Sequence, residues 1–320
     1  MGLALNFVLS VVGFLVLIKC ADFFVDGASS LAKNLKVPTI VIGLTIVAFG
    51  TSAPELAISF SSHLSGNFDI LFGNVIGSNI ANILLILGLS VLIVPFSIEN
   101  EVIKKQIPIL LLITMGFSTL FLDTVFTSSD VNTLSRADGI VLILFFSVFV
   151  YYLITVLSNK ETSGDVIEKP KYRMPKSVIY IAIGITGIII SSDLIVNNVA
   201  SIAESIGISQ KIISVTVISI GTSLPELVTT VVAAKKGENE MAIGNIVGSN
   251  IFNIGIVLGL PIAVLGEATT MAFSIVDITF LLLAAVLLWI FSATDRKIRR
   301  FEAVVFLFVY CGYIGYVILQ

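Results

Sequence analysis

Charged side chains are scarce in this sequence. Asp, Glu, Lys and Arg make up 12% of its 320 residues, whereas 57% are apolar. The charged share is about half that of a typical soluble domain. This composition excludes a soluble globular protein, a disordered chain and a basic nucleic-acid-binding protein, so no nucleic acid is expected as a partner.

Cysteine and histidine are nearly absent as well. Cys20 and Cys311 both fall inside apolar stretches, so neither a structural disulfide nor a thiolate metal site is expected. The single histidine, His63, excludes a histidine-based zinc site, and we expect it in a solvated loop. The HExxH, GxSxG and aspartate-rich diphosphate motifs are also missing, and an enzyme is therefore not predicted.

Long apolar runs, by contrast, recur from one end to the other, which is typical of a polytopic membrane protein. The first run starts at Leu3 with no Lys or Arg before it, and we interpret it as a span rather than a secretory signal. A short polar loop, 159–176, separates a first half, 1–158, from a second half, 177–320. The ten predicted spans are 4–29, 39–61, 70–95, 105–122, 138–157, 177–198, 210–233, 241–264, 271–292 and 301–319.

Basic residues alternate between the loops that join these spans. The odd-numbered loops contain 15 Lys and Arg, whereas the even-numbered loops contain two, Arg136 and Lys211. Cytoplasmic loops carry such an excess of Lys and Arg. The pattern predicts a cytoplasmic central loop, with the N-terminus and the C-terminus both outside.

The two halves repeat each other at a fixed offset of 171 residues. The string GTSAPE at 50–55 recurs as GTSLPE at 221–226, and GNVIGSNIANI at 73–83 recurs as GNIVGSNIFNI at 244–254. Five spans is an odd number, so the second half must cross the membrane in the opposite sense. The predicted fold is an all-α integral membrane protein with ten transmembrane helices in two inverted five-helix repeats, an architecture of secondary transporters with a midplane site.

Each GTS-x-PE string lies in the middle of an apolar span. Proline removes a backbone donor and clashes with the preceding turn, so both spans should break there and free backbone carbonyls. Hydroxyl oxygens from the same strings, and further oxygens on one face of the following helices, can line one cavity. These candidate ligands are Thr51, Ser52, Thr222, Ser223, Ser78, Asn82, Ser249 and Asn253.

Glu55 and Glu226 are the central candidates. A carboxylate at the bilayer centre costs at least ~2.5 kcal/mol on insertion scales. Equivalent points of inverted halves should meet at the midplane, where two carboxylates repel each other unless a cation or a proton lies between them. A site made only of oxygens suits hard cations such as Ca²⁺ and Na⁺.

These paired strings resemble the alpha repeats of the sodium/calcium exchanger (cation/calcium antiporter) superfamily, above all of its prokaryotic members. The resemblance covers essentially the whole chain. It implies a secondary active antiporter of a prokaryotic cell (inner/plasma) membrane that exchanges Ca²⁺ for Na⁺ by alternating access. The implied partners are Ca²⁺, Na⁺ and the lipid bilayer, with no cofactor and no obligatory protein partner.

The resemblance also assigns roles to residues. It implies that Glu55 and Glu226 bind calcium, and that the motif hydroxyls and next-helix serines listed above contribute with the backbone carbonyls of Ala48 and Ser219. One departure is Asn253, where several relatives carry an aspartate that is linked to potassium dependence. Its absence predicts potassium-independent exchange, and the short central loop leaves no room for calcium-sensing domains.

Two alternatives remain open at this point. A proton-coupled Ca²⁺/cation antiporter could use the same scaffold, because two adjacent carboxylates can share a proton. A cation channel is more distant, since pores are more often made by rings of subunits.

Overall fold

The computed structural model describes residues 3–126, 129–158, 169–207 and 219–319. Within these ranges, eight helices are long and apolar enough to cross a membrane, and one bent pair forms a further broken span. The first-half helices are α1 (Leu3–Leu35), α2 (Thr39–Ile42), α3 (Ala48–Thr51), α4 (Ala53–Leu64), α5 (Phe68–Ile80), α6 (Gly88–Ile93), α7 (Ile107–Phe121), α8 (Asp123–Phe126) and α9 (Arg136–Ser158). The second-half helices are α10 (Met174–Ser205), α12 (Ser219–Thr222), α13 (Leu224–Lys235), α14 (Asn239–Phe252), α15 (Gly259–Leu265), α16 (Ile275–Asp295) and α17 (Arg300–Leu319). The described residues also contain wider π-helical segments that adjoin these helices: η1 (Gly43–Val47), η2 (Ala81–Leu87), η3 (Val102–Gln106) and η5 (Asn253–Leu258).

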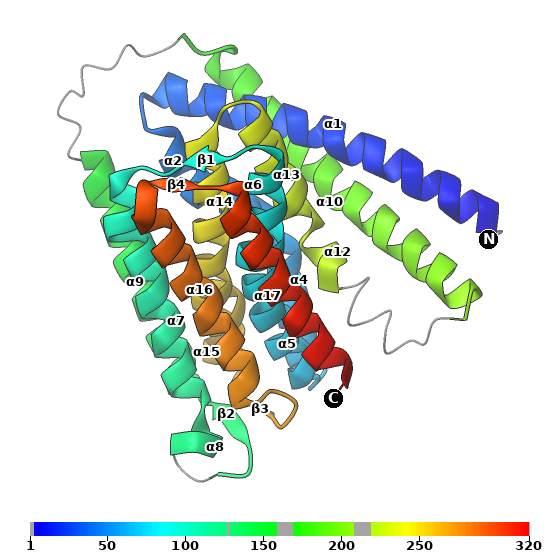
Figure 1. Ribbon diagram of the computed structural model, residues 1–320, viewed down its shortest axis with the longest axis vertical. Helices are drawn as coiled ribbons and strands as arrows, with labels where there is room; N and C mark the ends of the chain where they lie inside the picture. The colour runs from blue at the N-terminus through cyan, green and yellow to red at the C-terminus, as the bar shows by residue number, and fades with distance from the viewer. Residues whose placement is uncertain (1–2, 127–128, 159–168, 208–218, 320) are drawn as a thin grey trace.

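The helices of the two halves match at the offset that the sequence repeat gives. Adding 171 to the number of the first residue of α1, α4 and α5 gives the first residue of α10, α13 and α14, respectively. Two short antiparallel pairs also join the halves, β1 (Phe96–Ser97) with β4 (Lys297–Ile298) and β2 (Asn132–Leu134) with β3 (Ala268–Thr270). The pairs lie at opposite ends of the molecule (Figure 1). This is the arrangement of an inverted repeat.

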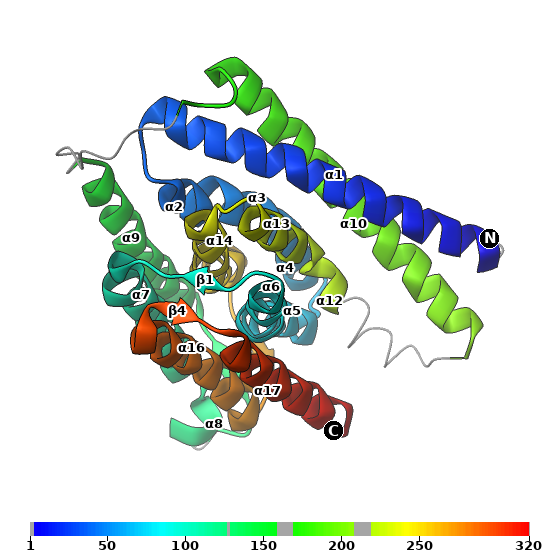
Figure 2. The same ribbon diagram turned by 45° about the horizontal axis from the view of Figure 1, so that its top comes forward.

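Helices α1 and α10 lie side by side and cross the rest of the bundle at a steep inclination (Figures 1 and 2). They contain 33 and 32 residues, so they extend well beyond the predicted spans 4–29 and 177–198. At 1.5 Å per residue each is about 50 Å long, whereas the hydrocarbon core is about 30 Å thick. A tilted helix accommodates such excess length.

Glycines bring these two helices into backbone contact. A Cβ atom built on Gly184 of α10 would lie 2.7 Å from the backbone nitrogen of Phe24 in α1. One built on Gly27 of α1 would lie 2.8 Å from the carbonyl oxygen of Ser177 in α10. Because lipid is as apolar as the side chains, membrane helices associate through such close packing. The α1/α10 pair is therefore a closely packed unit.

Both predicted breaks are present. Residues 39–51 and 53–64 meet at an angle of 45°, and Ser52 at the joint has φ −89° and ψ 8°. Pro54 is the second residue of α4 and has no N–H to donate to the Gly50 carbonyl. Ser223 has nearly the same geometry, φ −91° and ψ 6°, before α13. The first part of the predicted span 210–233 lies outside the described residues.

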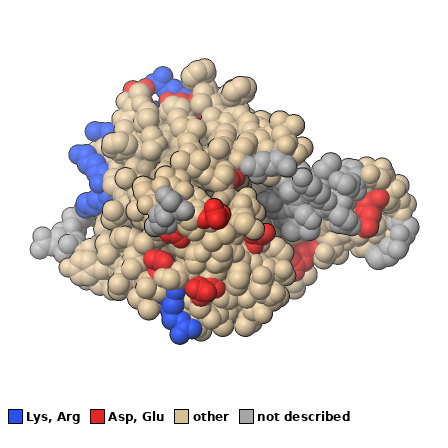
Figure 3. Space-filling view, turned by 90° about the horizontal axis from the view of Figure 1, so that it is seen from below, with Lys and Arg blue, Asp and Glu red and all other residues tan. Residues whose placement is uncertain are grey.

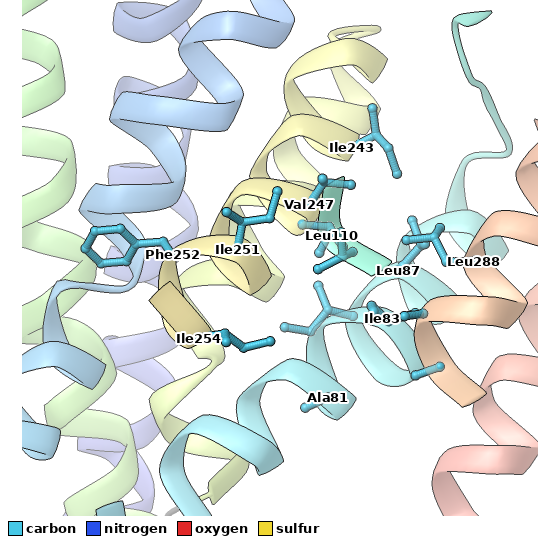
Figure 4. Close-up of a cluster of buried hydrophobic side chains, with 14 of the residues drawn as sticks. Ala81, Ile83, Leu87, Leu110, Ile243, Val247, Ile251, Phe252, Ile254 and Leu288 are labelled. Carbon is cyan, nitrogen blue, oxygen red and sulfur yellow. The ribbon is translucent and has the colours of Figure 1, made fainter. Parts of the chain in front are cut away.

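Helix α14 lies at the centre of the bundle. In the most apolar stretch that runs from α14 into α15, 83% of the residues are buried inside the protein. In the corresponding stretch of α9, which faces outward, 17% are buried. Ile243 and Val247 of α14 face Leu87 and Leu110 from the first half (Figure 4). The second motif string of the second half is therefore held inside the protein rather than against lipid.

The two ends of the bundle differ in charge. The face seen from the β2·β3 end carries scattered acidic side chains, and Lys and Arg appear at its edges (Figure 3). The opposite end carries the β1·β4 pair and a set of ion pairs, in which Lys236 contacts Asp22 at 3.3 Å and Asp26 at 2.8 Å. Lys171 also contacts Asp26, at 2.6 Å.

Candidate cation site

Two carboxylates from opposite halves define the candidate site. Glu55 lies in the first turn of α4 and Glu226 in the first turn of α13, and their exposed fractions are 1% and 0%. Ser52, the residue just before α4, donates its hydroxyl hydrogen to Oε1 of Glu226, so the turn that carries Glu55 lies beside Glu226. Each carboxylate lies at the positive end of its own helix dipole, which stabilises a negative charge there. The fold thus brings together the two residues that the sequence repeat singled out.

The broken segments of the two halves contact each other across the site. The Ser52 hydroxyl donates to Oε1 of Glu226 at 2.9 Å. The Thr51 hydroxyl donates to Val47 O at 3.1 Å and lies 3.3 Å from Oδ1 of Asn245 in α14. Both hydroxyls belong to the first half, whereas Glu226 and Asn245 belong to the second. The candidate site is therefore shared between the halves.

The next helices of each half add amides and hydroxyls. The π-helical segment η2 contains Asn82 in its first turn, and η5 begins at the equivalent Asn253. Segment η5 packs against α4, and η2 packs against α13, so each segment contacts the helix that carries the other half's glutamate. Ser78 and Ser249 lie one turn earlier, and both are buried. A π-helical turn is frequent at functional sites, and the sequence did not indicate one here.

The remaining predicted ligands occupy the breaks themselves. Ser223 is buried at the joint before α13, and Thr222 is half-buried at the end of α12. The Ala48 carbonyl, which the resemblance implied as a ligand, accepts from Ser52 N at 3.0 Å and lies 3.3 Å from the Thr51 hydroxyl oxygen. Ser219 starts α12, and its side chain is not among those described.

Many of these buried polar atoms form no hydrogen bond within the described residues. They include both carboxylate oxygens of Glu55 and Oε2 of Glu226. Leaving such atoms unpaired inside a protein is costly, and most so for a charged group. The donor set is all oxygen and amide, and in the described parts of the chain no three His, Cys, Asp or Glu side chains cluster as a metal site. Further unpaired polar atoms belong to the predicted ligands Asn82, Asn253, Ser223 and Ser249, and to Thr229 of α13.

Two asparagines of the site were not singled out from the sequence. Asn74 in α5 donates to the backbone carbonyl of Glu55 at 2.9 Å and to the Ser59 hydroxyl at 3.1 Å. Asn245 in α14 donates to the Thr230 hydroxyl at 2.9 Å. Both lie inside the repeated GN-x-x-GSN string at the 171-residue offset, and that repetition is the signal that could have found them.

Other polar residues of the spans lie elsewhere. His63 is buried in the last turn of α4, where its ring contacts Phe68 edge to face, so the prediction of a solvated loop is wrong. Asp277 is buried and caps α16 by accepting from Ser274 N at 2.8 Å. Asp22 forms the ion pair with Lys236 described above.

The chain as a whole was compared with known proteins. The sequence profile of the family described as "Sodium/calcium exchanger protein" matches residues 5–155 and 176–319. This chain belongs to that family. The match covers both halves and leaves out the central loop, as expected for a protein built from the two repeats.

Relatives of this exchanger-family chain are found in bacteria and archaea. It is 36% identical to the "Putative antiporter CaxA" of Alkalimonas amylolytica, over 94% of this chain and 95% of that protein. It is 31% identical to "Sodium/calcium exchanger MaX1" of Methanosarcina acetivorans, over 98% of both. The solved structure of the sodium-calcium exchanger NCX_Mj soaked with Na⁺ and Ca²⁺ superposes with a TM-score of 0.82 at 31% identity, covering 97% of this chain and 98% of that one. The chain is thus a multi-span membrane antiporter of the exchanger family.

Proposed function

We propose that the protein exchanges Ca²⁺ for Na⁺ by alternating access, with both ions bound between Glu55 and Glu226. The observation that carries this proposal is the pair of buried carboxylates from opposite halves, three of whose four oxygens form no hydrogen bond within the described residues. A divalent cation balances both charges and takes six to eight oxygen ligands. The hydroxyls, amides and carbonyls listed above supply the remaining oxygens.

Neutralisation of the site gives a physical reason for exchange rather than leak. A Ca²⁺ ion, or several Na⁺ ions on overlapping oxygens, cancels the two negative charges. The empty site keeps both charges in a low-dielectric interior, which is costly, so it resists the change of access. Only a site loaded with ions changes its access from one side of the membrane to the other. After it has carried one kind of ion across, it must therefore return loaded with the other kind.

The moving part that we propose is the α1/α10 pair, which slides against the core that carries the ligands. The packing supports this division. Gly27 and Gly184 hold α1 and α10 together backbone to backbone. Against the core, by contrast, α10 presents side chains rather than backbone, since a Cβ atom built on Gly50 or Gly221 would meet the Ile185 or Val196 side chain of α10. A helix pair that is joined backbone to backbone and meets the core through side chains suits a rigid-body shift.

Two finer features belong to the same proposal. Asparagine at Asn253 leaves two carboxylates in the site, which favours exchange without K⁺. In the described even-numbered loops, which include the β2·β3 end, Arg136 is the one basic residue, and this scarcity of Lys and Arg favours placing that end outside the cell membrane. The N-terminus and the C-terminus then lie outside.

A proton-coupled Ca²⁺ antiporter is the second candidate. The observation that favours it is that Glu55 and Glu226 are both buried in one site that the Ser52–Glu226 hydrogen bond joins, because two interacting carboxylates can hold one proton between them. In that case H⁺ would take the place of Na⁺ on the return step.

Sealed liposomes separate these candidates. We expect purified protein in Na⁺-loaded liposomes to take up Ca²⁺ on dilution into Na⁺-free medium, with or without K⁺ on either side. A pH gradient without Na⁺ should drive no uptake. Uptake that follows the pH gradient alone would overturn Na⁺ coupling, and uptake that requires K⁺ would overturn potassium independence.

A further inference from the structure

Asn74 and Asn245 occupy equivalent positions next to the candidate site, and they are bonded in equivalent ways. Their side-chain amides donate to the hydroxyls of Ser59 and Thr230, which are also 171 residues apart. Asn245, Ser59 and Thr230 have exposed fractions of 1% or less. In each half, α5 or α14 is therefore tied by its asparagine to the helix that carries the glutamate.

Each asparagine also contacts a candidate ligand, either through the ligand's backbone or through its side chain. The Asn74 amide reaches the carbonyl oxygen of Glu55 itself, at 2.9 Å. The Asn245 carbonyl oxygen lies 3.3 Å from the Thr51 hydroxyl of the other half. Asn245 thus links the broken segment of the first half to α13 of the second, which carries Glu226.

We propose that Asn74 and Asn245 are positioning residues for cation binding. They fix the two helix breaks relative to α5 and α14, so that the carboxylates and hydroxyls keep the spacing that Ca²⁺ requires. Neither asparagine is needed as an ion ligand. This inference rests on the proposed function, because it assigns a role within the same site.

The chain offers a matched control for each residue. Asn250 is buried in the same helix as Asn245, but its amide donates to Ile246 O of its own helix at 2.8 Å. Asn79 in the first half bonds in the same way to Val75 O, at 2.7 Å. Each control shares the residue type and the helix of its counterpart, and Asn250 also matches the burial of Asn245. The amides of both controls bond within their own helix rather than to a candidate ligand or a glutamate-bearing helix.

The test compares Asn245→Ala with Asn250→Ala in the liposome assay. Loss of a residue that orients metal ligands typically weakens metal affinity by 10- to 100-fold. We expect Asn245→Ala to raise the KM for Ca²⁺ by about tenfold or more, while the rate at saturating Ca²⁺ stays near that of the wild type. Asn250→Ala should lower the melting temperature yet leave the KM for Ca²⁺ unchanged.

Thr230→Val gives a second variant should Asn245→Ala fail to fold, because it keeps the volume and removes the bonded hydroxyl. It should raise the KM for Ca²⁺ in the same direction. An unchanged KM in the folded asparagine or threonine variant, or an equal rise in Asn250→Ala, would overturn the positioning role. Failure of the wild type to exchange would instead overturn the proposed function.

Discussion

Glu55→Gln and Glu226→Gln are each expected to reduce Ca²⁺ uptake to the level of protein-free liposomes. Two unit charges 4 Å apart interact by about 4 kcal/mol at an effective dielectric constant of 20, and the charge of Ca²⁺ doubles that figure. Removing one carboxylate should therefore weaken Ca²⁺ binding on the order of a thousandfold or more. The measurement is radioactive Ca²⁺ uptake driven by a Na⁺ gradient.

The same variants should remain folded. Each substitution removes a buried charge while keeping the size of the side chain, and relieving such a charge is often neutral or stabilising. We expect monodisperse protein with a melting temperature in Ca²⁺-free buffer no lower than that of the wild type. Glu267→Gln, at an exposed loop position before β3, is the control and should transport normally. Near-normal Ca²⁺ flux in either site variant would contradict the proposed mechanism.

Gly248→Ala is expected to cost both stability and transport. A Cβ atom at Gly248 would lie 2.8 Å from Cα and from the carbonyl oxygen of Leu44, and equally close to Cβ of Ala48. Backbone atoms cannot rotate away, so α14 must shift off the broken span of the first half. Overpacking of this kind costs about 1–3 kcal/mol. The shift also moves Ser249 relative to the first-half ligands, and most Ca²⁺ transport should be lost.

Gly312→Ala is the matched control for this prediction. Gly312 also lies within a transmembrane helix, α17, but no described atom beyond its chain neighbours and its own helix backbone lies within 4 Å of the position that its Cβ would take. This variant should keep the melting temperature and the Ca²⁺ uptake of the wild type. Thermal unfolding followed by fluorescence, together with the liposome assay, measures both effects. Wild-type behaviour of Gly248→Ala would show that the close approach of α14 to η1 and α3 is not required.

The sequence alone was sufficient for the symmetry of the fold and the place of the breaks. A constant offset of 171 residues is a property of the chain, and helices α10, α13 and α14 begin where it puts them. The breaks at Ser52 and Ser223 follow from Pro54 and Pro225, because a missing N–H acts locally whatever surrounds it.

Features that depend on tertiary packing were not predicted. The lengths of α1 and α10 reflect their tilt, which the neighbouring helices set rather than hydropathy. The π-helical turns at Asn82 and Asn253 have no established local signal in the sequence. His63 was expected in a loop because the second predicted span ends at residue 61, but α4 continues to Leu64 and the His63 ring contacts Phe68.

The candidate ligand set shows the same division. Glu55 and Glu226 could be identified from the repeat because a lone carboxylate in an apolar span is rare. The asparagines Asn74 and Asn245 could not be ranked above other small polar residues, since their role depends on which hydroxyls and carbonyls the fold places beside them.

The most direct test of the central claim is equilibrium Ca²⁺ binding to the purified protein in detergent, titrated by calorimetry at increasing Na⁺. The account predicts one saturable site per chain, whose apparent affinity falls as Na⁺ rises and whose heat disappears in Glu55→Gln and in Glu226→Gln. Calcium binding that ignores Na⁺, or that survives both substitutions, would contradict the claim that the two ions share the site between these carboxylates.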